Sequence, residues 1–209
     1  MTRIRPLPIE SVSAELREAV ELQQNLLGLV PESLLTMAYR PRMAAIFSAL
    51  ASEVLNPGTL DRGLKQLVAY ISSSTTGCRY CQAHTAQSAH ELAGVDLVKL
   101  QTAFEFEISP LFSEAEKAAL RFARDASFVP NEVTDQHFVE LKRWYSNEQI
   151  VEMTGVIALF GWLNRWNDTM ATSLEDSPRL FVERNLGVNS RRRVEKRPQT
   201  IPGELARAK

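Results

Sequence analysis

Apolar residues recur at intervals of three and four along almost the whole chain, and this spacing restricts the possible folds more than any other feature. Met43, Ile46, Phe47, Leu50 and Val54 form one such run, and we expect this helix side to face the core. No segment alternates apolar and polar residues as strands do, and no Asn-Gly pair marks a hairpin. The sequence therefore predicts an all-α bundle of about seven or eight helices.

Turn and capping residues divide this pattern into separate helices. The apolar spacing of residues 64–71 runs into "SSSTTG", whose hydroxyl groups compete for backbone hydrogen bonds, so we expect the helix to break there. A new helix should begin near Cys78 and stop at Gly94. Capping boxes at 113–116 and 146–149 predict the starts of two later helices.

Composition and charge suggest one acidic domain followed by a basic tail. Residues 178–209 carry nine Lys/Arg and three Glu, which leaves 15 basic and 22 acidic residues in 1–177. We expect a single helical domain over 1–177 and a tail over 178–209 that is solvated, or that lies on its own body or a neighbouring subunit. The tail segment "SRRRVEKR" has no aromatic residue to stack on a base, so nucleic acid is not an expected partner.

The sequence also carries signals of where in the cell the protein is located. No apolar run approaches the ~20 residues that cross a bilayer, and "MTRIRPLPIE" lacks the apolar stretch of a secretory signal. Two cysteines cannot build a disulfide framework. We therefore expect a cytoplasmic protein without a membrane partner.

The segment "GCRYCQAH" holds both cysteines and one of the three histidines. A Cys-x-x-Cys spacing on a helix puts the two sulfurs on adjacent turns, close enough for a disulfide. Cys78 is expected in the first turn, where the helix dipole favours a thiolate. His84 lies three residues beyond Cys81, within reach for proton transfer.

Three other interpretations of this segment remain open. The cysteines could be small core residues. A zinc site from Cys78, Cys81, His84 and His90 would draw all its ligands from one helix, a poor match to a tetrahedron. A thioredoxin-like motif needs a βαβ context that is missing here. A redox pair fits best, and we expect neither a metal nor a cofactor.

A longer segment resembles a known family. "LKQLVAYISSSTTGCRYCQAHTAQSAHELAGV" and "FSEAEKAALRFARDAS" are similar to the AhpD-like alkylhydroperoxidase and carboxymuconolactone decarboxylase family, most densely over residues 60–95 and loosely over 30–170. The resemblance implies an AhpD-like multi-helix bundle and a homo-oligomer. It also implies that Cys81 becomes a sulfenic acid on meeting a peroxide, that Cys78 resolves it as a disulfide, and that an external dithiol restores both thiols.

Two positions depart from the family pattern. The family commonly has a glutamate twelve residues before the first cysteine, where this chain has Gln66, and an amide cannot accept a proton at neutral pH. The family's histidine often lies four residues after the second cysteine, where this chain has Thr85, with His84 one position earlier. The candidate catalytic set is thus Cys81, Cys78, His84 and Gln66.

Three functions follow from these observations. The first is a thiol peroxidase that reduces hydroperoxides. The second is a redox-sensing or binding module that has lost turnover, suggested by Gln66. The third is a carboxymuconolactone decarboxylase-type enzyme in which the cysteines are incidental. Elsewhere, Asn164, Arg165 and Asp168 of "NRWND" are expected to form a buried structural network, and Trp162 and Trp166 are candidate interface residues.

Overall fold

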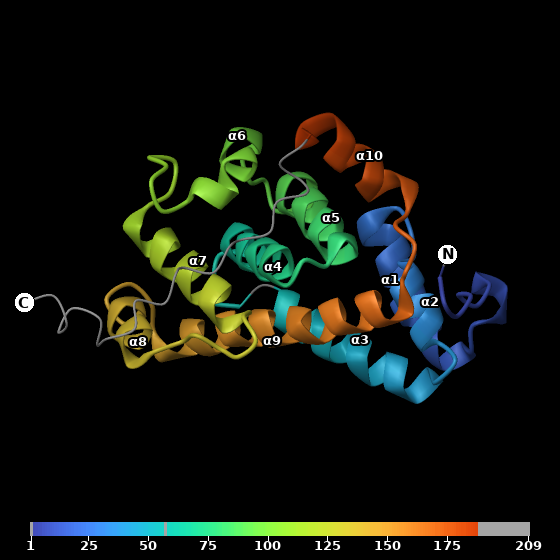
Figure 1. Ribbon diagram of the computed structural model, residues 1–209. Coiled ribbons are helices and arrows are strands. Elements are labelled where there is room, and N and C mark those ends of the chain that lie inside the picture. Colours follow the sequence, from blue (N-terminus) through green and yellow to red (C-terminus); the bar gives the residue numbers. More distant parts are fainter. Residues whose placement is uncertain (1, 57, 188–209) are drawn as a thin grey trace, which may run out of the picture.

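A computed structural model describes residues 2–56 and 58–187, and within these residues every regular element is a helix. The long helix α9 (Asn147–Met170) runs along one side of the molecule, and α4 (Arg62–Thr76) and α5 (Arg79–Gln87) pack over it (Figure 1). The predicted all-α fold is confirmed.

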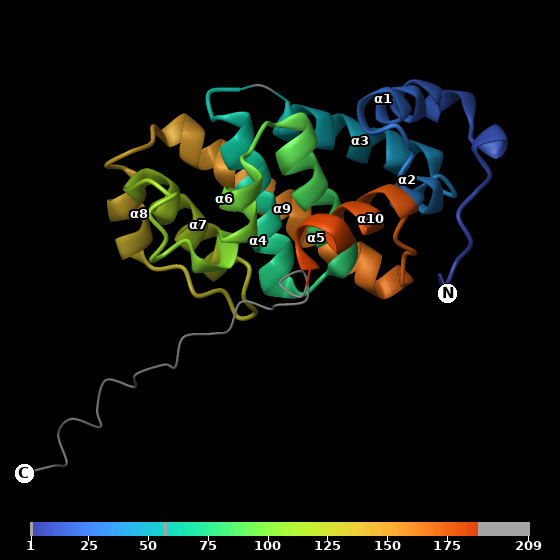
Figure 2. The ribbon, with the colours of Figure 1, turned by 90° about the horizontal axis from the view of Figure 1, so that it is seen from above.

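The remaining helices surround this centre. Helices α1 to α3 lie toward one end of α9, and α7 and α8 lie toward the other end (Figures 1 and 2). Their bounds are α1 Arg17–Leu27, α2 Glu32–Met37, α3 Pro41–Leu55, α6 Leu97–Gln101, α7 Glu114–Ala126, α8 Asp135–Leu141 and α10 Asp176–Asn185. Short 3-10 turns occupy Ile9–Ser11, Ala14–Leu16 and Ala103–Glu105, and a π-helical turn occupies Ser88–Leu92.

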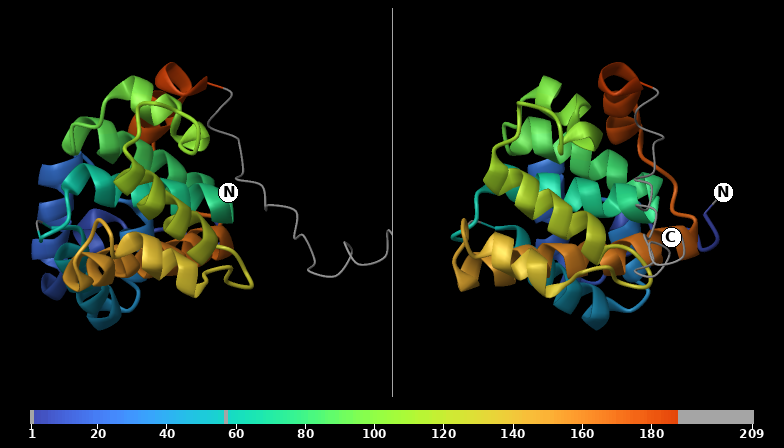
Figure 3. Two further views of the ribbon diagram at one scale, coloured as in Figure 1. Left: turned by 90° about the vertical axis from the view of Figure 1, so that its left-hand side faces the viewer. Right: turned by 60° about the vertical axis from the view of Figure 1, so that its left-hand side comes forward.

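Helix α4 forms the middle of the core. It packs against α5, α7 and α9 (Figure 3), and Leu67, Val68 and Ile71 are at most 1% exposed. A smaller apolar cluster around Leu16 and Met37 fills the space among α1, α2 and α3. Because other helices cover α4 on several sides, the segment that follows α4 begins in the buried interior of the protein.

The predicted break at "SSSTTG" is wrong, because α4 continues through Thr76. Hydroxyl groups in this stretch donate to carbonyl oxygens one turn earlier instead of opening the helix: Ser74 to Tyr70 at 2.7 Å and Thr75 to Ile71 at 2.8 Å. A helix accommodates such bonds when tertiary packing holds it. The chain turns instead at Gly77, whose φ of 82° is in the left-handed region that glycine adopts readily.

The apolar run on α3 also lies differently from the prediction. Met43, Ile46 and Leu50 are 37%, 62% and 53% exposed, so the predicted core-facing side is largely a surface. Ala44 is fully buried instead, and Phe47 packs against both apolar clusters. Both sides of α3 are apolar, so periodicity alone could not select the buried one.

The predicted helix starts at the two capping boxes are confirmed. Ser113 accepts the backbone N–H of Glu116 and starts α7, and Ser146 accepts that of Gln149 and starts α9. The helix expected from Cys78 to Gly94 is α5 followed by the π-helical turn, and Gly94 has a φ of 69°. Each cap satisfies backbone groups that helix ends would leave unpaired.

The C-terminal part of the described chain is helical. Residues 178–185 of the expected tail lie in α10, which packs against α5. Residues 186 and 187 follow this helix, and residues 188–209 of the expected tail lie outside the described part of the chain. No helix within the described ranges is long and apolar enough to cross a membrane.

Candidate active site

The candidate active site begins where α4 gives way to α5. Cys78 is the N-cap of α5, and its N–H donates to the carbonyl oxygen of Ser73 at 3.1 Å. We predict Cys78 in the first turn, but the structure places it just before the helix and puts Cys81 at the third helical position. Cys81 is therefore the cysteine in the first turn of α5.

Both thiols are free and buried, with Cys78 0% and Cys81 3% exposed. Cys78 contributes to raising the pKa of the Cys81 thiol, so the two side chains are neighbours, as the Cys-x-x-Cys spacing predicts. Both residues also belong to the main apolar core. A disulfide between them needs little backbone movement.

A third side chain reaches Cys81 from another helix. Asn167 on α9 donates from Nδ2 to Cys81 Sγ at 3.3 Å. Asn167 is only 2% exposed, and its Oδ1 has no hydrogen-bond partner within the described part of the chain. An N–H aimed at sulfur stabilises negative charge there when the thiol loses its proton.

Burial has the largest effect on Cys81 and raises the pKa of its thiol well above the ordinary value. The neighbouring Cys78 and the charge of Asp168 raise this pKa further, while the Asn167 hydrogen bond lowers it. The raised pKa favours the protonated thiol of Cys81, whereas the helix dipole alone would favour a thiolate. Cys81 thus rests as a thiol, and its activation requires a base.

His84, one turn after Cys81 on α5, is paired with a carboxylate. Its Nε2 lies 2.7 Å from Oε2 of Glu175, the residue that precedes α10. The other oxygen of Glu175 accepts the Tyr80 hydroxyl and the Glu32 backbone N–H, each at 2.7 Å. Burial alone would raise the pKa of Glu175, but hydrogen bonds from these three partners and the charge of His84 outweigh it and lower that pKa.

Cys81 and His84 open onto one cavity of about 200 Å³ between α1, α3, α4, α5 and α9. Gln66 and Asn167 contribute polar groups to it. Much of the remaining wall is aliphatic or aromatic, including Leu22, Leu26, Leu27, Leu55, Leu92, Phe160 and Leu163. Cys78 lies behind Cys81 and is not part of this wall. The arrangement suits a small apolar molecule brought against one sulfur.

Three of the four candidate residues therefore meet in one cavity. Gln66 lies on α4, and its amide can donate and accept hydrogen bonds but cannot take a proton at neutral pH. Thr85, at the position of the family's histidine, donates from its hydroxyl to the Cys81 carbonyl oxygen at 2.7 Å. His84 is thus the histidine that faces the cavity with Cys81.

Sequence reasoning missed Asn167 and Glu175. Asn167 lies within "NRWND", in which Asn164, Arg165 and Asp168 were expected to form a buried network; the structure buries Asn164 but leaves Arg165 and Asp168 exposed. The position of Asn167 four residues after the core-side Leu163 was an available signal. Glu175 is 91 residues from His84, and no local pattern joins them.

The other sequence candidates lie outside this site. His90 hydrogen-bonds the Val95 carbonyl oxygen through Nδ1 at 2.9 Å. Within the described ranges, no group of three or more His, Cys, Asp and Glu residues is placed to hold a metal. Trp162 stacks between Phe47 and Trp166, with ring centroids 4.4 and 5.1 Å away.

The structure defines an all-α protein with a buried Cys-x-x-Cys pair at the start of α5, and comparison with known proteins supports the fold. Residues 41–125 match the model of the carboxymuconolactone decarboxylase family. The structure of a peroxidase-related protein with an alkylhydroperoxidase AhpD core from Ralstonia eutropha superposes with a TM-score of 0.75, at 19% identity, over 86% of this chain and 95% of that one. This chain belongs to the carboxymuconolactone decarboxylase family, and its fold is AhpD-like.

Three further proteins are similar to this chain. The debrominase Bmp8, in a cysteine-to-alanine variant bound to 2,3,4-tribromopyrrole, is 35% identical over 88% of this chain and 97% of its own, with a TM-score of 0.82. The protein YnjA of Escherichia coli is 30% identical over 111 residues, which are 53% of this chain. The matched segments span 60% of YnjA and 46% of a related Mycobacterium tuberculosis protein, Rv2313c.

Proposed function

We propose that the protein is a dithiol-dependent reductase in which Cys81 attacks a small apolar hydroperoxide and Cys78 resolves the product. The observation that carries this proposal is the placement of Cys81: its sulfur has Cys78 behind it and an apolar cavity shared with His84 in front of it. A buried thiol with a neighbouring thiol and an open approach suits two-step oxidation and resolution.

The steps balance without a cofactor. Cys81 sulfur attacks the outer oxygen of the hydroperoxide, the O–O bond breaks, and an alcohol leaves as Cys81 becomes a sulfenic acid. Cys78 sulfur then displaces that hydroxyl as water and forms the Cys78–Cys81 disulfide. An external dithiol exchanges with this disulfide and restores both thiols.

Proton transfer falls to the His84–Glu175 pair. The raised pKa of Cys81 means that its proton must leave as the substrate arrives. His84 can accept the proton, and the ionised Glu175 held at 2.7 Å stabilises the resulting imidazolium. Asn167 then donates to the sulfur that carries the negative charge. In this scheme Glu175 supplies the carboxylate that Gln66 cannot, and Gln66 orients the substrate by hydrogen bonds.

A second candidate function is reductive removal of halogen from an aromatic ring. It is favoured by 35% identity with a debrominase across 97% of that chain, together with the apolar cavity wall. The overall change balances in the same way: a carbon–halogen bond becomes carbon–hydrogen, halide leaves, and two thiols become a disulfide.

One experiment separates these candidates. Reduced protein with excess dithiothreitol is supplied with either cumene hydroperoxide or 2,3,4-tribromopyrrole, and alcohol or bromide formation is measured. The hydroperoxide function predicts catalytic turnover with cumene hydroperoxide that is lost in Cys81→Ser. Bromide release dependent on Cys81 supports the second function instead. A Cys81→Ser protein that keeps activity on a lactone supports the decarboxylase-type alternative, and stoichiometric oxidation without turnover supports the sensor.

We also propose a homo-oligomer that works in the cytoplasm, where free thiols persist. Exposed Met43, Ile46 and Leu50 on α3 provide an apolar face for a second copy. Ile46→Glu should shift the mass measured by light scattering toward that of a single chain, whereas Glu53→Gln, also on exposed α3 surface, should not. An unchanged mass in Ile46→Glu would place the interface elsewhere.

A further inference from the structure

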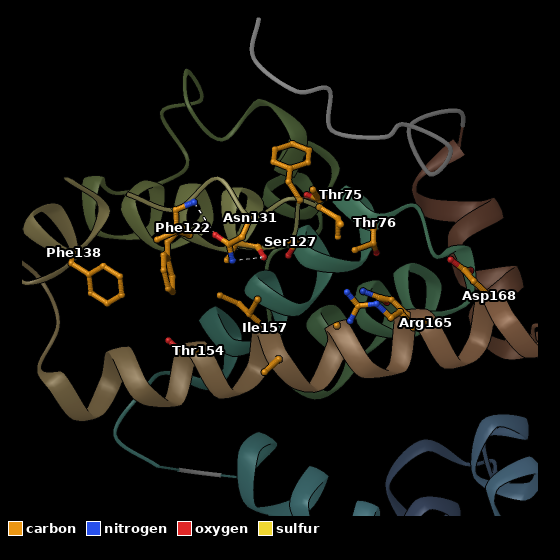
Figure 4. A pocket seen from close by; sticks show the side chains of 17 residues that line it. Thr75, Thr76, Phe122, Ser127, Asn131, Phe138, Thr154, Ile157, Arg165 and Asp168 are labelled. Carbon is orange, nitrogen blue, oxygen red and sulfur yellow. Dashed lines mark hydrogen bonds between the residues drawn. The ribbon is translucent and has the colours of Figure 1, made fainter. Parts of the chain in front are cut away.

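A second and larger cavity lies on a different side of helix α9. It has a volume of about 870 Å³ and is bounded by α7, the end of α4, the loop after α7 and α9 (Figure 4). None of its lining residues belongs to the cavity that contains Cys81. Its volume is within the range of small-molecule sites.

The walls of this cavity are suited to an apolar body. Phe122 and Phe138 pack edge to face at one end, with ring centroids 5.6 Å apart, and Ile157 rises from α9 beside them (Figure 4). Such side chains bind aromatic or branched aliphatic groups by excluding water.

Gly161 leaves additional room in the wall. A Cβ built at this position on α9 would meet no atom within 4 Å. Glycine is unfavourable inside a helix compared with alanine, and its left-handed freedom is not used here. The missing side chain therefore enlarges the cavity without serving the backbone.

One buried polar residue of the wall, Asn164, lacks hydrogen-bond partners for its side chain. Asn164 is 2% exposed, and neither atom of its side-chain amide has a hydrogen-bond partner among the described residues. Buried amides are normally paired. A ligand held against this wall could supply the missing bond.

Arg165 adds a positive charge at the same wall. Its side chain extends from α9 toward the space below Thr76 (Figure 4). No carboxylate in the described part of the chain pairs with Arg165, whereas Arg121 and Arg124 on the neighbouring α7 both pair with Glu107. The wall also holds Asp168, one turn further along α9 (Figure 4), but no ion pair joins it to Arg165 among the described residues. A guanidinium without an ion pair is well suited to a ligand carboxylate, which it binds through two hydrogen bonds.

We propose that this cavity binds a small molecule with an aromatic or branched apolar body and one carboxylate. The carboxylate lies on Arg165, a polar edge hydrogen-bonds Asn164, and the body packs between Phe122 and Ile157. This site is separate from the thiol cavity, so it does not depend on the proposed reaction at Cys81.

The test uses 2-naphthoate and its neutral match 2-naphthamide as probes, with binding to the full-length reduced protein measured by calorimetry. Gly161→Leu fills the cavity where a side chain meets no atom. Arg165→Gln removes the charge, and Arg42→Gln removes the same charge from exposed surface on α3. Cys81→Ser alters the thiol cavity only. Thermal unfolding of each variant confirms that it is folded.

The proposal expects 2-naphthoate to bind about tenfold more tightly than 2-naphthamide, because one is charged and the other is not. Gly161→Leu and Arg165→Gln should each weaken 2-naphthoate by about tenfold or more, whereas Arg42→Gln and Cys81→Ser leave it unchanged. Equal affinity for the two probes, no saturation below about 1 mM, or loss of binding only in Cys81→Ser would overturn it. If Gly161→Leu unfolds the protein, Arg165→Gln decides alone.

Discussion

Nε2 of His84 and Oε2 of Glu175 lie 2.7 Å apart, which joins the helix of the two cysteines to the segment before α10. The same carboxylate also holds Tyr80 and the backbone of Glu32. One acidic residue thereby fixes the histidine that faces the Cys81 cavity. Its removal tests the proposed proton transfer.

Glu175→Gln should slow Cys81 oxidation by hydroperoxide about tenfold to a hundredfold, because His84 loses the charge that stabilises its protonated form. The measurement is stopped-flow loss of thiols over a range of pH. Glu183→Gln, on the exposed surface of α10, is the control and should match the wild type. Equal rates in the wild type and Glu175→Gln would mean that the pair is structural only.

The pKa of Glu175 also sets a pH dependence of stability. It is lowered from 4.5, because hydrogen bonds from His84, Glu32 and Tyr80 outweigh the effect of burial. The ionised form therefore stabilises the fold above pH 4.5, and this contribution is lost as pH falls through the lower, folded-state pKa. Urea titrations should show a stability gap between wild type and Glu175→Gln that is constant from pH 6 to about 5 and narrows below 4.5. A gap that widens in acid would contradict the assigned direction.

Asn167 is expected to control the acidity of Cys81. Asn167→Leu removes the N–H that lies 3.3 Å from the sulfur, so the pKa of Cys81 should rise further and its alkylation by iodoacetamide near neutral pH should slow several-fold. Asn164→Leu is a matched control, since Asn164 is equally buried on the same helix but makes no such bond. Equal slowing in both variants would indicate a general packing effect.

The ion pair between Lys65 and Glu152 should be important for stability. Lys65 is 2% exposed, and its Nζ lies 2.8 Å from Glu152 Oε2. Burial opposes ionisation of Glu152, but bonds from Lys65, Thr59 and Leu60 lower its pKa to about 2. Glu152→Gln removes the carboxylate from a buried cation, which keeps only the carbonyl oxygens of Val54 and Asn56. The variant should lower the unfolding midpoint by several degrees.

The Glu152 variant needs a surface control. Glu53→Gln removes a carboxylate from exposed α3 and should leave the midpoint nearly unchanged. The gap between wild type and Glu152→Gln should persist at neutral pH and shrink as pH falls from 4.5 toward 2. A midpoint equal to that of the control would mean that the carbonyl oxygens of Val54 and Asn56 are sufficient to hold the Lys65 ammonium.

The two cysteines should give different trapped products. Cys78→Ser cannot resolve the oxidised Cys81, so hydroperoxide should leave a sulfenic acid that dimedone labels. Cys81→Ser should give no label, because Cys78 is fully buried behind it. Dimedone labelling of Cys78 in Cys81→Ser would mean that Cys78 attacks the peroxide and Cys81 resolves the product.

The sequence predicted the helical class and the helix starts at Ser113 and Ser146, because capping is local and depends on residues three apart. It failed at "SSSTTG", where core packing keeps α4 helical, and on α3, where two apolar sides compete. Tertiary packing decides such cases and is not encoded in local spacing.

The catalytic roles of the candidate site residues stay predictions, but their proximity can be compared with the structure. Cys81, His84 and Gln66 share a cavity; the local Cys-x-x-Cys segment pointed to Cys81 and His84, and the family resemblance pointed to Gln66. Asn167 and Glu175 reach the site from positions 86 and 91 residues away from their partners. Only the folded arrangement of α5, α9 and the segment before α10 reveals them.

Intact mass and free-thiol counts after mixing the reduced protein with one equivalent of cumene hydroperoxide test the central claim most directly. We predict that both thiols disappear together and that the mass decreases by two hydrogens, because Cys78 and Cys81 close as an intramolecular disulfide. Two thiols that persist and remain open to alkylation in the peroxide-treated protein would contradict a peroxide-reducing pair.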